Sequence, residues 1–192
     1  MLAPFRLALA ALVLWPVLAR GEALPEGYPS SYGTLIAASK LEGKLVVYTT
    51  VAAAQWKPLL QGFKHRYPWL TAQTLVLAAD AMMPRYAEEK AAMGTTGDLL
   101  VNASAEAWRE LAARQEVLPY DSPEAATLPP EAQPMPGLYV MAIDPVVMLA
   151  VPRAVTSVNA AKLLLDYILS PAGQAALAEG GLTPFRRSAG RL

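Results

Sequence analysis

The sequence predicts an α/β fold in which a parallel sheet lies between two layers of helices, and three observations lead to this prediction. Strand-like and helix-like segments alternate three times between residues 44 and 114. The strand-like runs are short and almost continuously apolar, which is typical of strands buried on both faces of a parallel sheet. Amphipathic helices follow near the C-terminus. Such alternation implies right-handed crossovers within one three-layer domain.

The composition excludes several classes of protein. Hydrophobic residues make up 54% of the 192 residues and charged residues 17%, which is too apolar for a disordered chain. The net charge is zero, so nothing in the charge balance indicates a nucleic-acid partner. There is no cysteine and only one histidine, His65. We therefore expect no disulfide, no cofactor and no transition-metal site.

The N-terminus has the pattern of a secretory signal peptide. Arg6 precedes an apolar run over residues 7–18, and small residues follow it. A membrane anchor is the alternative, but the run is shorter than the roughly 20 residues that span a bilayer, and Pro16 interrupts it. We expect residues 1–23 to be a signal peptide, a periplasmic location, and one α/β domain over residues 24–192.

In the first half of the domain, glycine and proline residues mark the boundaries between the predicted elements. Gly43 precedes a β-branched run, and Pro68 ends an amphipathic helix. The predicted elements are a short helix over Thr34–Lys40, strands over Lys44–Thr49, Leu70–Leu77 and Asp98–Val101, and helices over Ala53–Tyr67, Asp80–Met93 and Ser104–Arg114, the last two capped by Asp80 and Ser104.

The second half begins with an irregular, proline-rich connection over residues 119–137. Strands are predicted over Leu138–Ile143 and Val146–Val151, a helix capped by Asn159 ends near Leu169, and another starts at Ser170-Pro171 and stops at Gly180-Gly181.

Ligands of parallel α/β sheets bind at the carboxyl ends of the strands. Two loops qualify, because each follows a strand and leads into a helix N-terminus that favours an anion. Their polar residues, Thr49, Thr50, Asn102 and Ser104, are the candidate ligand-binding residues. The alternative is that they are ordinary turn and cap residues. Tyr139 is a fifth candidate that either lines a cleft or is buried in its strand.

Four segments resemble a known family. They are GYPSSYGTLIAASKLEGKLVVYTT, WKPLLQGFKHRYP, RYAEEKAAMGTTGDLLVNAS and NAAKLLLDYILSPAGQAALAEGGLTPFR. In this order they resemble the bacterial periplasmic solute-binding proteins of ABC transporters that include the ferric-iron binders. The resemblance covers about residues 27–118 and 151–187. It implies a type II periplasmic-binding-protein fold, a small-molecule solute, and an ABC permease in the inner membrane as partner.

The sequence departs from that family in length. The resemblance implies two lobes, with the second lobe lying between the matching segments. Here only about 30 residues occupy that interval, which is too few to build a lobe. We therefore expect a shortened protein from which the second lobe is largely absent. The tyrosines that ligate ferric iron in the family belong to the absent part, so no metal ligand can be carried over.

Two functions remain open, and catalysis is not one of them. His65 is the only imidazole, and neither a glycine-rich phosphate loop nor a histidine–glutamate metal spacing occurs. We expect no catalytic residue. The first function is binding of a small, anionic or metal-chelate solute for an ABC uptake system. The alternative is a one-lobe remnant, or an accessory or sensory module, with weak or no ligand binding.

The apolar run near the N-terminus makes a testable prediction about export. Mature protein isolated from its native host should be found outside the cytoplasm, and its N-terminal sequence should start near Arg20 or Leu24, because cleavage is expected after Ala19 or Ala23. Cytosolic protein that still begins at Met1 would contradict this prediction.

Overall fold

The computed structural model describes residues 24–92, 94 and 96–186. The expected signal peptide over residues 1–23 lies outside this part of the chain. The elements in chain order are α1 (Tyr32–Glu42), β1 (Lys44–Thr49), α2 (Ala53–Arg66), β2 (Thr71–Val76), α3 (Ala79–Ala91), β3 (Leu99–Asn102), α4 (Ala105–Ala113), the 3₁₀ turns η1 (Pro123–Thr127) and η2 (Pro130–Ala132), β4 (Leu138–Ile143), β5 (Val146–Ala150), α5 (Val158–Leu169) and α6 (Pro171–Glu179).

The strands form one five-stranded sheet in the order β2-β1-β3-β5-β4. β1 pairs in parallel with β2 and with β3, whereas β5 runs antiparallel to both β3 and β4. The prediction of a parallel sheet is therefore wrong for one strand. β5 runs antiparallel, whereas the other four strands share one direction. The reason is local, since the short turn at Asp144-Pro145 reverses the chain directly after β4.

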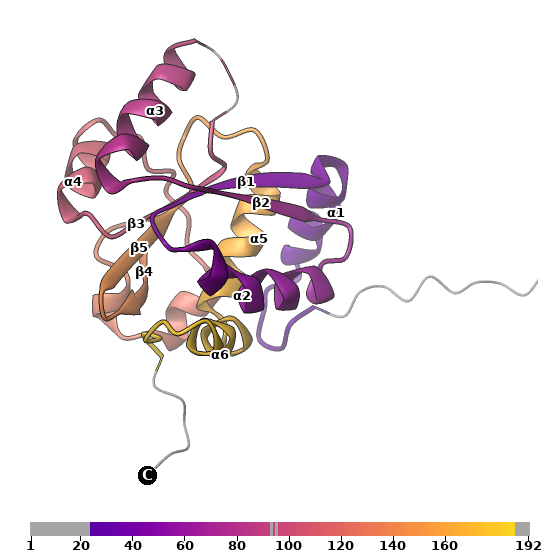
Figure 1. The fold of residues 1–192 in the computed structure, drawn as a ribbon. Helices are drawn as coiled ribbons and strands as arrows, with labels where there is room; N and C mark the ends of the chain where they lie inside the picture. Colours follow the sequence, from indigo (N-terminus) through magenta and orange to yellow (C-terminus); the bar gives the residue numbers. More distant parts are fainter. Residues whose placement is uncertain (1–23, 93, 95, 187–192) are drawn as a thin grey trace, which may run out of the picture.

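Helices cover both faces of the sheet, which confirms the three-layer α/β architecture (Figure 1). On one face α1, α2, α5 and α6 enclose a core that includes Trp56 and Phe63. On the other face α3 and α4 pack Met82 and Trp108 against the sheet. Within the described ranges, no helix combines the length and the apolar character needed to cross a bilayer.

The helix starts agree only partly with the predicted caps. Ser104 caps α4 as predicted, and Ser170, at the predicted start of α6, is also a cap; the hydroxyl of each accepts a bond from the backbone N–H three residues later, both at 3.2 Å. Asp80 does not cap α3, because the helix begins earlier, after Ala78, and Asp80 lies in its first turn. Asn159 does not cap α5 either, since that position falls to Ser157, whose side chain makes no capping bond.

Two carboxylates from distant elements replace the predicted cap of α5. Glu42, the last residue of α1, accepts bonds from the backbone N–H of Asn159 at 3.1 Å and of Ala160 at 2.6 Å. Asp98, which precedes β3, accepts bonds from the N–H of Ser157 at 2.8 Å and of Thr156 at 3.0 Å. Both carboxylates also suit the positive end of the helix dipole.

Replacing Glu42 with alanine should lower the free energy of unfolding by about 2 kcal/mol, because the first amides of α5 lose a charged acceptor in a partly buried place. Urea denaturation of wild type and variant measures this. Glu88→Ala is the matched control, since Glu88 is exposed on α3, and it should stay within about 0.5 kcal/mol of wild type. Equal effects of the two substitutions would contradict the capping role.

Candidate functional site

The carboxyl ends of β1 and β3 lie side by side at one edge of the sheet, and they form a topological switch point. β1 and β3 are neighbours, but the helix after β1 packs on one face and the helix after β3 packs on the other (Figure 1). The backbone N–H of Thr50 donates to the carbonyl of Val101 at 3.0 Å, so the two loops are held together. Ligands of open α/β sheets bind in the crevice that forms where the connections of two neighbouring strands leave on opposite faces of the sheet.

Thr49 supports this edge from inside. Its side chain is fully buried on the α2 face, and its hydroxyl oxygen accepts bonds from the Trp56 indole Nε1 and the Val51 backbone N–H, both at 3.0 Å. These two bonds fix the course of the loop between β1 and α2.

Asn102 fixes the course of the loop after β3 from the opposite face of the sheet. Its Oδ1 accepts a bond from the backbone N–H of Ser104 at 2.7 Å, and its Nδ2 donates to the carbonyl of Ala79 at 3.4 Å. The indole Nε1 of Trp108 donates to its backbone carbonyl at 3.0 Å. Asn102 thereby joins the end of β3 to the beginnings of α3 and α4.

Thr50 and Ser104 are the two candidates that reach the surface at this edge, where both are half-buried. Ser104 Oγ caps α4, whereas the Thr50 hydroxyl makes no hydrogen bond within the described part of the chain. We call Thr50, Ala103 and Ser104 the shelf. The structure therefore brings the two loops together but turns Thr49 and Asn102 inward, and solute contact by all four residues stays a prediction.

Tyr139 lies apart from the shelf. It is fully buried in β4, and its hydroxyl accepts bonds from the Ser122 backbone N–H at 2.9 Å and the Gln133 Nε2 at 3.0 Å while it donates to the carbonyl of Tyr120 at 2.8 Å. These partners belong to the proline-rich connection, so the tyrosine holds that segment against the sheet. Its role as a ligand contact is likewise a prediction.

A buried carboxylate that the sequence reasoning did not identify lies under the same connection. Asp166 on α5 is 1% exposed and accepts bonds from the hydroxyls of Tyr32 and Tyr120, both at 2.7 Å, and of Ser122 at 2.6 Å. Burial raises the pKa of Asp166 to about 6. Burial and the nearby Asp166 also raise the pKa of Tyr32 and of Tyr120. A signal was present in the sequence, since an acidic residue on the apolar side of an amphipathic helix needs buried partners.

A second set of bonds ties the connection to both ends of the domain. Glu124 in η1 pairs with Arg186 at 2.6 Å and accepts a bond from the hydroxyl of Tyr28 at 2.7 Å. Arg186 Nε also donates to the carbonyl of Leu169 at 2.9 Å. The connection is therefore an ordered part of the lobe, although it contains neither an α-helix nor a strand.

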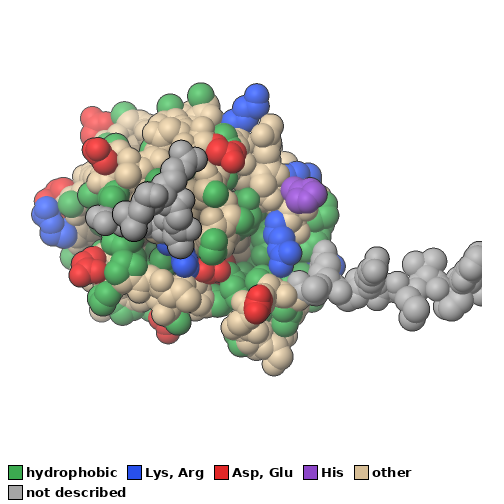
Figure 2. All heavy atoms as spheres, turned by 90° about the horizontal axis from the view of Figure 1, so that it is seen from below, with side chains coloured by type: hydrophobic (Ala, Val, Ile, Leu, Met, Phe, Trp, Pro, Cys, Tyr) green, Lys and Arg blue, Asp and Glu red, His purple; other side chains and the backbone are tan. Residues whose placement is uncertain are grey.

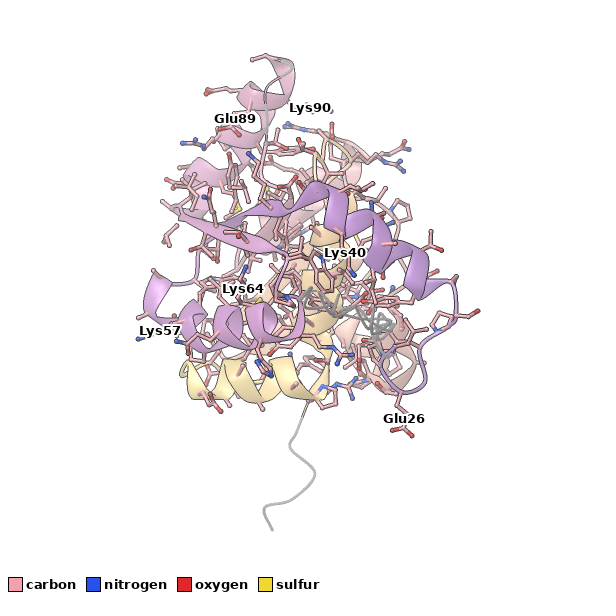
Figure 3. All side chains as sticks on the ribbon, turned by 90° about the vertical axis from the view of Figure 1, so that its right-hand side faces the viewer. Glu26, Lys40, Lys57, Lys64, Glu89 and Lys90 are labelled. Carbon is pink, nitrogen blue, oxygen red and sulfur yellow. The ribbon has the colours of Figure 1, made fainter. Side chains whose placement is uncertain are left out.

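The charged surface shows no concentration of one sign on the face seen in Figure 2, where acidic and basic side chains lie scattered. Lys57 extends outward from α2, and Glu89 and Lys90 lie on α3 (Figure 3). The latter two are paired, with Arg85 at 2.8 Å and with Glu116 respectively. Among the described residues, no group of three or more acidic or histidine side chains is arranged to hold a metal ion.

The raised pKa of Asp166 predicts that this residue makes stability depend on pH. The folded protein holds the proton up to about pH 6, whereas an unfolded aspartate releases it near pH 3.9. The contribution is therefore fully present below about pH 4 and falls by up to about 3 kcal/mol as pH rises to about 6. Urea denaturation from pH 4 to 7 should show this fall in the difference between wild type and Asp166→Asn. A difference that stays flat or grows with pH would refute it.

Comparison with known proteins supports the fold. No protein-family model matches the sequence, and the search of curated proteins returned no significant match. Among solved structures, an ABC-transporter substrate-binding protein from Agrobacterium tumefaciens aligns with a TM-score of 0.68 at 11% identity, covering 74% of this chain and 79% of that one. Iron-bound HitA from Pseudomonas aeruginosa aligns with a TM-score of 0.65 at 11% identity, covering 76% and 87%.

The periplasmic binding protein AfuA from Actinobacillus pleuropneumoniae, solved with fructose-6-phosphate, aligns with a TM-score of 0.62 at 10% identity, covering 75% of this chain and 85% of that one. Identities this low show the fold alone. The chain therefore has the type II fold of periplasmic substrate-binding proteins, and its described residues build one lobe around a single sheet.

Proposed function

We propose that this chain is the solute-binding component of an ABC uptake system, and that it binds a small anionic or metal-chelate solute in the periplasm. The observation that carries the proposal is the switch point between β1 and β3, which coincides with the loops that the sequence selected. The structural neighbours add support, since one holds iron and another holds a sugar phosphate. An ABC permease is the partner that this function requires.

The proposed contacts come from the shelf and from two helix N-termini. The Thr50 and Ser104 hydroxyls donate to the solute, while Thr49 and Asn102 hold the loops in place. α2 begins after Ala52, whose side chain offers no cap, so its first amides point to the same edge without a side-chain acceptor. An anion is favoured there because helix N-termini carry unsatisfied N–H groups and partial positive charge. Lys57, one turn into α2, adds an exposed cation (Figure 3).

Binding to a single copy should be weak. A two-lobed binding protein closes over its ligand, which excludes water and strengthens each polar contact. One lobe offers one wall, and the solute on it faces water. A loss of even about 4 kcal/mol weakens binding roughly a thousandfold, which turns a micromolar affinity into a millimolar one.

The second candidate function is a one-lobe remnant, or an accessory or sensory module, that binds weakly or not at all. The observation that favours it is that the polar side chains of Thr49, Asn102 and Ser104 all bond within the protein. Three of the four candidates thus have a structural role that does not need a solute.

Calorimetry of the purified mature protein with iron chelates, phosphonates, sulfate and small carboxylates tests the proposal. A member of this panel should bind, and Thr50→Val should weaken its binding about fivefold, because one hydrogen bond of about 1 kcal/mol is lost while the side-chain shape is kept. The matched control is Thr71→Val, which removes an exposed hydroxyl at the amino end of β2 and should leave affinity unchanged.

Two outcomes would count against the shelf. Purified protein that binds no member of the panel would favour the remnant. Binding that Thr50→Val and Thr71→Val alter equally would place the site elsewhere in the molecule.

A further inference from the structure

The exposed apolar side chains of the described chain are unevenly distributed. Its large hydrophobic residues with high exposure are Val76 at 45%, Ile143 at 43%, Val146 at 48% and Leu41 at 91%. The first three lie at the carboxyl edge of the sheet, since Val76 ends β2, Ile143 ends β4, and Val146 begins the antiparallel β5. Leu41 lies near the end of α1, before β1 starts, and so at the opposite edge.

These three residues lie on both sides of the shelf. The strand order places β2 at one end of the sheet and the β5–β4 hairpin at the other, with β1 and β3 between them. Val76 is level with Thr49 in the register, and Ile143 pairs with Val146. A polar shelf thus lies between two exposed apolar spots along one edge.

This arrangement is complementary to itself under a two-fold rotation. An axis perpendicular to the sheet, placed at the end of β3, sets a second copy edge to edge with the first. The rotation exchanges the two ends of the edge, so Val76 of each copy meets Ile143 and Val146 of the other. Reciprocal contact of this kind defines the symmetric interface of a dimer.

We infer that two copies of this chain pair through the carboxyl edges of their sheets, and that each copy supplies the second wall of one shared solute site. The inference rests on the proposed function, since it names the partner that completes that site. Pairing buries the exposed valines and isoleucine and excludes water from between the two shelves. Polar contacts to a solute become stronger in such an enclosed place.

The size of the edge suits this partner. Five strands spaced about 4.8 Å apart give an edge about 24 Å long, and three layers give it a depth of about 30 Å. The resulting area of about 700 Å² is close to the roughly 800 Å² per partner of a standard interface. Residues 24–192 carry 14 basic and 15 acidic side chains, so two mature copies repel each other little through their total charge.

Sedimentation velocity of the mature wild-type chain, without added solute and over a range of concentrations, is the direct test. A monomer–dimer equilibrium is expected. Val146→Asp should weaken dimerisation about tenfold or more, because it places a charge in an apolar contact. Val76→Asp should have the same effect from the other side of the contact. Leu41→Asp is the matched control and should leave the equilibrium unchanged, while circular dichroism verifies that all variants are folded.

Each remaining outcome is decisive. A wild-type chain that stays monomeric at submillimolar concentration overturns the inference, and so does a dimer that Leu41→Asp weakens as much as Val146→Asp. A dimer that Val146→Asp leaves intact, as pairing through the outer strand β2 would produce, overturns it as well. The proposed function is tested separately. A dimer that binds no solute would support the pairing and contradict the proposed function. A monomer that binds solute would support the proposed function and contradict the pairing.

Discussion

The amide groups at the start of α5 need acceptors, and the carboxylates that satisfy them hold the two ends of the chain together. Asp98 accepts bonds from Thr156 and Ser157 and also from the backbone N–H of Val46 in β1, at 2.8 Å. Glu42 adds the bonds to the following amides. A helix that begins more than fifty residues after β3 is thereby fixed beside the first strand. Without these acceptors, buried N–H groups would lack partners, which is costly in free energy.

Once α5 is fixed, its buried Asp166 determines where the proline-rich connection lies. The hydroxyls of Tyr120 and Ser122 reach the carboxylate from the connection, and that of Tyr32 reaches it from α1. No buried side-chain polar atom in the described part of the chain lacks a partner. A segment without an α-helix or a strand can therefore pack as part of the lobe, because its polar groups have partners inside.

Local patterns in the sequence were enough for the elements and for the shelf loops. β1 has its predicted bounds, Ser104 caps α4 as predicted, and α6 starts at Ser170-Pro171 as predicted, because strand propensity and helix starts depend on a few neighbouring residues. The cap of α5 could not be predicted, since its acceptors lie far away in sequence. The inward orientation of Thr49 and Asn102 could not be predicted either, because it depends on which helix covers each face. The antiparallel direction of β5 could not be predicted from the alternation of strands and helices, because it results from the turn at Asp144-Pro145, which reverses the chain between β4 and β5.

Both strands that end at the shelf are joined to a tryptophan indole, Trp56 through Thr49 and Trp108 through the carbonyl of Asn102. These rings are 1% and 2% exposed, and they lie on opposite faces of the sheet. Indole emission responds to hydrogen bonding and to local polarity. The molecule therefore carries an intrinsic optical reporter on each side of its carboxyl edge, so events at that edge become visible without an attached dye.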